Sequence, residues 1–179
     1  MKRTALFLLL ALLLALAPGM PAEEADLMNQ FVENFHVHTV VPDGYRYIDS
    51  FVSEILYIGY LRPKDMTLPQ ALITIAYDEE AHGRTLNELS DEEVLRMVDD
   101  FMQDTPDATV EYRETGEGTR LIVFNTHTKA ETRIDIVTLW RGYQIACMIF
   151  PGEQSKTKEV NQEDLAGIIT FLTQTQITQ

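Results

Sequence analysis

The chain has 179 residues, and its 28 acidic side chains outnumber its 14 basic ones, which gives a formal net charge of −14. Such a charge repels phosphate, so it excludes nucleic-acid binding and argues against docking on anionic lipid head groups. The apolar fraction of 45% is typical of a folded domain and too high for a disordered chain. The single cysteine, Cys147, excludes an intramolecular disulfide and a cysteine-rich metal site.

Residues 1–22 have the pattern of an export signal. Two basic residues precede an unbroken apolar run, residues 5–17, and a Pro-Gly pair ends it. As a helix this run would rise only about 20 Å, too little to cross a hydrocarbon core of about 30 Å. We therefore expect cleavage before Glu23, or before Met20 as the second choice, with an uncleaved signal anchor as the alternative. The cleaved chain would be secreted or periplasmic, without membrane insertion, and would carry 12 basic against 28 acidic residues, a net charge of −16.

The mature chain, residues 23–179, has no linker rich in Pro, Gly or Ser and no internal repeat, so we expect one domain. Helical spacing of apolar residues predicts a short helix over residues 24–34. Alternating, β-branched and aromatic residues then predict four strands, over residues 35–41, 45–53, 54–61 and 72–77.

The second half of the chain begins with a central helix. Ser90 and Glu93 have the spacing of a capping box. The apolar side chains predicted for one face of this helix are Val94, Leu95, Met97, Val98, Phe101 and Met102. Four strands follow, and their short connectors predict an antiparallel meander. The predicted strands cover residues 108–114, 119–127, 132–140 and 143–150. A last helix follows Asn161, and the polar tail 173–179 is expected to fray.

The order of these elements predicts an α+β fold, a largely antiparallel sheet with helices packed on it. Residues 121–124, Leu-Ile-Val-Phe, are apolar in both alternating positions. A strand of this kind is expected to be covered on both faces. The sequence therefore predicts a three-layer α/β/α sandwich.

The export signal, the sequence Val-Pro-Asp-Gly-Tyr at residues 41–45, the capped central helix, the meander and the closing helix together resemble the PsbP/DcrB-like α/β/α sandwich proteins. The resemblance covers most of residues 35–173, with Tyr45 where that family usually has tryptophan. It implies an exported, non-enzymatic binding or accessory protein. It carries no catalytic residue over to this chain.

The sequence offers little for catalysis. None of the four serines lies in a Gly-x-Ser-x-Gly motif, and no glycine-rich phosphate loop is present. Cys147 alternates with Ile145 and Ile149, so we expect its thiol to be buried and inert. A small cell-wall or sugar hydrolase with paired carboxylates stays open as a weaker alternative, because only coordinates reveal such a pair.

Acidic residues are concentrated in residues 78–104, which hold ten acids and two arginines. One interpretation is a solvated helix face, with acids at the favourable end of the helix dipole. The other is a docking face for a basic protein partner, with Asp99 and Asp100 as contact residues.

His36 and His38 are two residues apart in a predicted strand, so both side chains leave the same face. Such a pair could hold zinc, or copper, with a third ligand from His82 or His127. The alternative is that both imidazoles lie on the exposed face, because the residues between and beside them are more apolar. Four tyrosines, Tyr45, Tyr47, Tyr57 and Tyr60, could likewise form an aromatic strip for sugars or proteins, or simply pack in the sheet.

The sequence thus predicts an exported, soluble, noncatalytic binding or accessory protein whose ligand it does not name. A metal-binding protein that uses the histidine pair is the first alternative, and the small hydrolase is the second.

Overall fold

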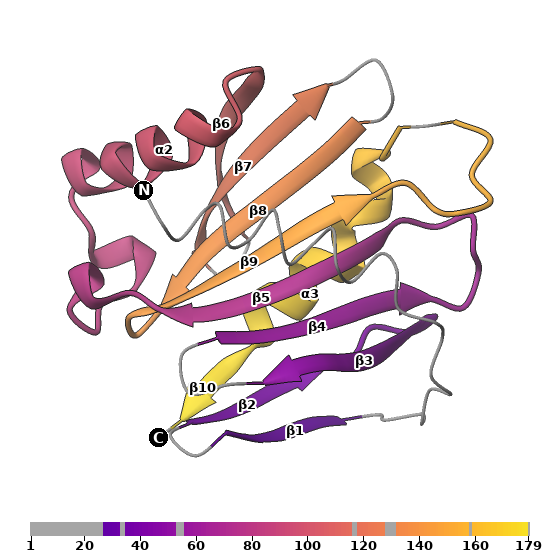
Figure 1. The fold of residues 1–179 in the computed structure, drawn as a ribbon, viewed down its shortest axis with the longest axis horizontal. Coiled ribbons are helices and arrows are strands. Elements are labelled where there is room, and N and C mark those ends of the chain that lie inside the picture. The colour runs from indigo at the N-terminus through magenta and orange to yellow at the C-terminus, as the bar shows by residue number, and fades with distance from the viewer. Residues whose placement is uncertain are drawn as a thin grey trace.

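A computed structural model describes residues 27–32, 35–52, 56–115, 118–127, 132–157 and 159–178. The predicted export signal lies outside these residues. The elements in chain order (Figure 1) are β1 (Leu27–Val32), β2 (Phe35–Val40), β3 (Tyr45–Val52), β4 (Leu56–Pro63), β5 (Gln70–Tyr77), η1 (Glu79–Ala81), η2 (Leu86–Glu88), α2 (Asp91–Asp104), β6 (Ala108–Glu114), β7 (Arg120–His127), β8 (Thr132–Trp140), β9 (Tyr143–Phe150), η3 (Gln162–Leu165), α3 (Ala166–Gln174) and β10 (Gln176–Thr178). No helix among the described residues is long and apolar enough to span a membrane.

Seven strands form one antiparallel sheet, in the order β3-β4-β5-β9-β8-β7-β6 (Figure 1). It consists of two meanders, β3 to β5 and β6 to β9. They join where β5 and β9 pair along their whole length, from Gln70 opposite Phe150 to Tyr77 opposite Tyr143. The predicted antiparallel meander is confirmed, and α2 lies in the long connection between the two halves of the sheet.

The tightest connection in the sheet is the turn between β8 and β9. Trp140 pairs with Tyr143, so the turn consists of Arg141 and Gly142 alone, with φ angles of 46° and 85°. Positive φ at both central residues is typical of the type I′ turn, whose twist matches that of the flanking strands. A Cβ atom on Gly142 would lie 3.1 Å from backbone atoms of Gly83, so close packing also requires glycine here.

A second, three-stranded sheet has the order β1-β2-β10. The helix predicted over residues 24–34 is wrong for its described part, because Leu27–Val32 is strand β1. The register runs up to Val32 opposite Phe35, so β1 and β2 form a hairpin. A short apolar run fits either a helix or a strand, and the pairing with β2 decides between them.

The predicted fraying of the tail 173–179 is also wrong for most of its residues. Gln176–Thr178 is strand β10, and Ile177 pairs with Val37 of β2. Ile177 is only 3% exposed. The Thr175 hydroxyl donates to the carbonyl of Phe171 at 2.7 Å, and its oxygen lies 3.0 Å from the hydroxyl of Thr39. One apolar side chain and one threonine therefore anchor a segment whose composition looks unstructured.

One face of the large sheet packs on α3 and on the small sheet. Ile168, Phe171 and Leu172 of α3 are at most 1% exposed, and they share one apolar cluster with Val37, Ile177 and the strand residues on this face. The other face packs on α2, where Val94 and Val98 are buried and Phe101 stacks on Phe124 of β7.

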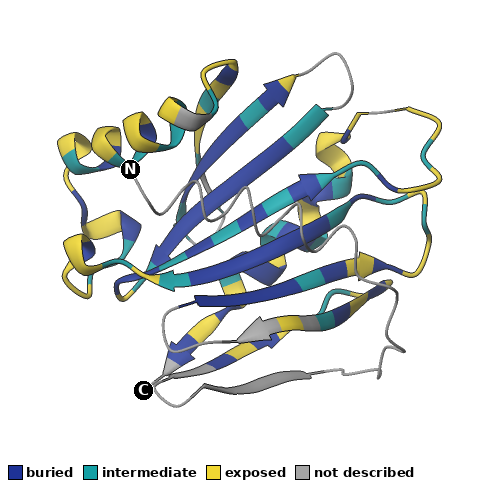
Figure 2. Ribbon diagram, in the orientation of Figure 1, coloured by how far each residue is buried: buried dark blue, intermediate teal, exposed yellow. Residues whose placement is uncertain are grey.

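Residues 121–124 of β7 contribute to both clusters. Leu121 and Val123 lie on the α3 side, and Ile122 and Phe124 lie on the α2 side. The prediction of an α+β fold, with a largely antiparallel sheet between helices, is confirmed. Figure 2 shows the central strands mostly buried and α2 exposed along its outer side.

Candidate functional site

The segment between β5 and α2, residues 78–90, packs against the turn between β8 and β9. The Asp78 N–H donates to the carbonyl of Gly142 at 2.7 Å, and the Gly142 N–H donates to the carbonyl of Arg84 at 2.8 Å. The Asp78 carboxylate also caps η1 by accepting the Glu80 N–H at 3.0 Å. These bonds fix the position from which α2 begins.

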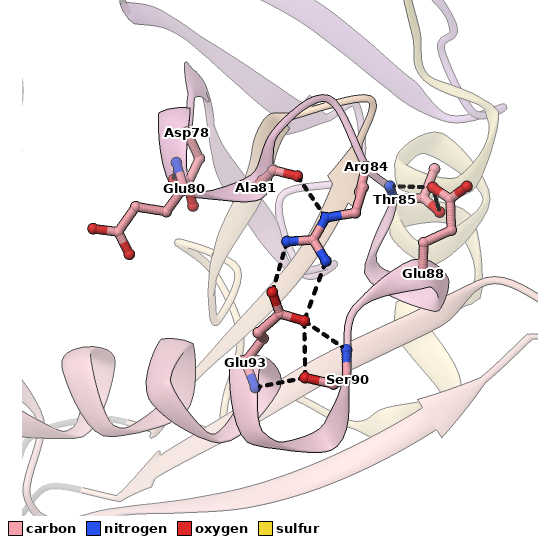
Figure 3. Close-up of polar contacts among 8 residues, drawn as sticks. All are labelled: Asp78, Glu80, Ala81, Arg84, Thr85, Glu88, Ser90 and Glu93. Atoms are coloured by element: carbon pink, nitrogen blue, oxygen red, sulfur yellow. Dashed lines mark hydrogen bonds and ion pairs between the residues drawn. The ribbon is translucent and has the colours of Figure 1, made fainter.

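Arg84 is at the centre of the polar network in Figure 3. Its Nε donates to the carbonyl of Ala81 at 3.0 Å. Its Nη1 and Nη2 donate to the two carboxylate oxygens of Glu93 at 3.2 and 2.7 Å. A guanidinium matches a carboxylate in this two-pronged geometry, so the pair fixes the angle between the loop and the helix.

Glu93 is at the same time part of the helix cap. Its carboxylate accepts the Ser90 N–H at 2.9 Å and the Ser90 hydroxyl at 2.8 Å, and Ser90 Oγ accepts the Glu93 N–H at 3.4 Å (Figure 3). The predicted capping box is confirmed. The hydrogen bonds from Arg84, followed by those from Ser90, lower the pKa of Glu93 to about 2. Glu93 is therefore committed to structure.

The outer side of α2 carries exposed acidic side chains, namely Asp91, Glu92, Asp99 and Asp100. Asp91 is 94% exposed and lies 3.6 Å from Arg120, a distance at which an exposed ion pair contributes little. Within the described part of the chain, Asp99 and Asp100 form no ion pair. Asp100 accepts one long hydrogen bond, 3.5 Å, from Gln103. The predicted contact residues are thus exposed and unpaired among the described residues, although exposed Arg96 lies three and four residues before them on the helix. This arrangement fits a solvated face and a docking face equally.

Leu95 was expected on the buried face of this helix, and that expectation is wrong. Its side chain is 54% exposed. At about 100° per residue, Leu95 lies about 200° from Glu93, on the opposite side of the helix. Asp91 and Asp99, four residues before and after it, lie on the same side. The helix therefore carries one large exposed apolar side chain between two acids.

A second exposed apolar side chain lies on the neighbouring strand β6. Tyr112 is 50% exposed, and Val110, two residues earlier, packs in the α2-side cluster. Because side chains alternate along a strand, Tyr112 projects to the α2 side of the sheet. The acidic helix and the exposed edge of the sheet thus share one surface.

Three of the four tyrosines considered for an aromatic strip are in the core, and so the packing alternative holds for them. Tyr45, Tyr47 and Tyr57 are at most 8% exposed. The hydroxyls of Tyr47 and Tyr57 are hydrogen-bonded to each other, and the Tyr45 hydroxyl donates to the carbonyl of Pro69 at 3.1 Å. Burial, with a smaller contribution from Asp164, raises the pKa of Tyr45 to about 12. Tyr60 is partly exposed on the other face of the sheet.

Strand β2 contains both histidines of the predicted metal site. Val37 is fully buried and Thr39 is 3% exposed, whereas His38 is exposed, as expected for the polar face. His36 pairs with Thr178 in the backbone register. His82 and His127 are exposed, on the loop after η1 and at the end of β7. Among the described residues, no group of three or more His, Cys, Asp or Glu side chains is placed to hold a metal ion.

No sequence pattern indicates a buried acid, yet Asp135 of β8 is 1% exposed. Arg133 Nε donates to its Oδ2 at 2.9 Å, and its Oδ1 has no hydrogen-bond partner in the described part of the chain. Burial raises the pKa of Asp135 to about 6, against the opposing effect of Arg133. Its neighbours in register are Phe124 and Met148, so the strands bring apolar groups to it rather than the second carboxylate that a glycosidase requires.

Cys147 lies on the opposite face, fully buried and free, as expected. Burial raises the pKa of its thiol. A buried thiol with a raised pKa is a poor nucleophile.

A search of protein-family models and a search of curated protein sequences find no match to this chain.

Proposed function

We propose that this protein is an exported, noncatalytic binding protein that docks a basic protein partner on the outer side of α2. The observation that supports the proposal is the exposed Leu95, between Asp91 and Asp99, on a helix whose exposed Asp99 and Asp100 form no ion pair with the described residues. An exposed apolar side chain flanked by acids gives a partner both a contact to bury and a charge to match.

The geometry of the loop before the helix also supports this proposal. Arg84 and Ser90 hold Glu93, and the β8–β9 turn holds the loop. A surface whose backbone is fixed in this way loses little conformational entropy on binding. The resemblance to the PsbP/DcrB-like proteins belongs to the same proposal, because it implies an exported accessory protein.

The proposal is tested with mature protein, residues 23–179, and whichever proteins it retains from an extract of the native cell envelope. Retained proteins are identified, purified and measured for association and dissociation rates against the parent chain and against Asp99→Lys/Asp100→Lys. We expect the double variant to associate about tenfold or more slowly than the parent, with a smaller change in dissociation. Association of the parent should slow as salt is raised, and this salt dependence should be weaker in the variant.

The matched control is Glu159→Lys/Glu163→Lys. These two acids are exposed near the start of α3, on the other side of the sheet, and the change in net charge is the same. The proposal is overturned if both double variants slow association equally, because net charge rather than the α2 surface would then govern binding.

A further inference from the structure

Strand β6 is the edge of the seven-stranded sheet on the side of α2. It pairs with β7 and with no other described strand. Its residues 108–114 contain no proline, and the register with β7 runs without interruption from Ala108 opposite Thr126 to Glu114 opposite Arg120. Natural proteins protect such an edge with proline, a bulge, a covering element or charged side chains. Strand β6 has neither proline nor bulge, and its charged residues are Glu111, Arg113 and Glu114.

The hydrogen bonds at the end of β6 establish which backbone groups face the open edge. The Thr115 N–H donates to the carbonyl of Thr119 at 3.0 Å, so the amide of Thr115 points toward β7. Amide directions alternate along an antiparallel strand. The backbone groups of Glu111 and Arg113 therefore also point toward β7, and those of Val110, Tyr112 and Glu114 point outward.

The acidic side of α2 lies along this same edge. Asp91 reaches Arg120, which pairs with Glu114 of β6, so the side of α2 that carries Asp91, Leu95 and Asp99 faces the β6 margin of the sheet. The opposite side of the helix carries Glu93 and faces Arg84 and the β8–β9 turn.

We propose that the partner binds by adding a basic, extended segment to β6 as an eighth, antiparallel strand. The proposal rests on the proposed function and specifies how the partner binds. In such a pair, residues opposite Val110, Tyr112 and Glu114 exchange both backbone hydrogen bonds with them and project their side chains to the same face. That face is the α2 side, where Asp91 and Asp99 are. The segment should therefore have Lys or Arg at alternating positions.

A second copy of this chain is a poorer occupant of the edge. Antiparallel pairing of β6 with its own copy relates the two sheets by a two-fold axis perpendicular to them, which brings both α2 helices to the same face. Two acidic helices would then repel each other in a chain that already carries a large negative charge. Charge complementarity favours a basic segment.

The test uses mature protein and an end-capped peptide of four Lys-Val repeats, about the length of one strand. Amide hydrogen exchange followed by NMR should slow by about tenfold or more at Val110, Tyr112 and Glu114 when the peptide is bound. The amides of Glu111 and Arg113, which already bond to β7, should change little. The same peptide with Glu in place of Lys should not bind.

Two N-methylated peptides separate strand pairing from simple charge attraction. Methylation of every Lys amide removes the N–H groups that face β6, so affinity should fall by about tenfold or more. Methylation of every Val amide leaves those groups intact, so affinity should stay within about threefold. On the protein, Tyr112→Pro removes an outward N–H without removing a bond to β7, and it should lose binding, whereas Tyr112→Ala should only weaken it.

The remaining outcomes distinguish failure of strand addition from failure of the proposed function. If both methylated peptides bind as well as the parent peptide and Asp91→Asn/Asp99→Asn abolishes binding, the acidic surface holds but strand addition is wrong. If the Glu peptide binds as well as the Lys peptide, the proposed function itself is wrong. If exchange at Val110, Tyr112 and Glu114 slows with protein concentration alone, the occupant is a second copy and strand addition by a basic partner is wrong.

Discussion

Arg84 and Glu93, nine residues apart, are joined by two hydrogen bonds of 3.2 and 2.7 Å, which tie the loop after β5 to the first turn of α2. The same carboxylate accepts two hydrogen bonds from Ser90. One side chain therefore completes the helix cap and fixes the orientation of the acidic helix relative to the sheet.

Glu93→Gln is expected to lower stability at neutral pH and to leave it unchanged in strong acid. The pKa of Glu93 is lowered from about 4.5 to about 2, mainly by Arg84. A lowered pKa contributes stability that is present above the unfolded-state pKa and is lost as pH falls through the folded-state value. Urea midpoints for parent and variant should thus differ at pH 7 and converge between pH 4.5 and 2. Glu92→Gln, on the exposed neighbour, is the control, and equal effects of the two variants would contradict the assignment.

Ile177→Ala is expected to destabilise the protein by about 2–5 kcal/mol, the usual cost of truncating a fully buried isoleucine. Ile177 is 3% exposed and packs in the cluster that contains α3. Urea unfolding at pH 7 measures the loss. Gln176→Ala, on the exposed face of the same short strand, should change stability by no more than about 0.5 kcal/mol. A similarly small effect of Ile177→Ala would mean that β10 is not anchored to the core.

Local sequence signals predicted the elements that local interactions stabilise. The capping box of Ser90 and Glu93 and the two-residue turn at Arg141 and Gly142 lie where they were expected, because each depends on residues close in the chain. Segment 27–32 and β10 were mispredicted, because each becomes a strand only by pairing with β2. Short segments of this kind depend on tertiary contacts that no local pattern encodes.

The acidic side of α2 and the neighbouring edge of the sheet were predictable only in part from the sequence. The acidic composition of residues 78–104 indicated exposed acids, and Asp99 and Asp100 are exposed. Leu95 was wrongly expected to be buried, because helical spacing does not reveal how wide the buried face of a helix is. Leu95 lies at the margin of that face and is 54% exposed. Two features had no sequence signal of their own. The pairing of Arg84 with Glu93 depends on the path of the loop, and the open edge of β6 depends on the order of strands in the sheet.

The histidine pair of β2 gives a prediction for zinc. The side chain of His36 lies outside the described residues, and no group of three or more His, Cys, Asp or Glu among the described ones is placed to hold a metal ion. Two imidazoles alone bind zinc weakly. Zinc titrated into metal-free mature protein at pH 7.5 should therefore bind with a Kd weaker than about 1 μM. Calorimetry of the parent and of His36→Ala/His38→Ala measures this. Stoichiometric binding tighter than about 1 μM that disappears in the double variant would replace the proposed function by a metal-binding one.

The stability of Asp135→Asn relative to that of the parent is expected to increase as pH rises. Burial raises the pKa of Asp135 from 3.8 to about 6, so the folded state binds this proton more tightly than the unfolded state does. The stability that comes from the protonated carboxyl is fully present below pH 3.8 and is lost as pH rises through about 6. An amide does not titrate, so the variant does not lose this stability. The free energy of unfolding of the variant, minus that of the parent, should therefore increase between pH 4 and 7.5.

The size of this shift should be on the order of 1–3 kcal/mol, because each pKa unit corresponds to about 1.4 kcal/mol. Urea unfolding at several pH values between 4 and 7.5 measures it. The ion pair with Arg133 forms only as Asp135 ionises, so its effect is already contained in the pKa of about 6. Any pH-independent cost of the substitution cancels in the slope, and the slope therefore carries the test. Asp107→Asn, on an exposed residue before β6, is the control and should leave the slope unchanged. If parent and Asp135→Asn show parallel pH profiles, the Asp135 carboxyl does not have a raised pKa in the folded protein.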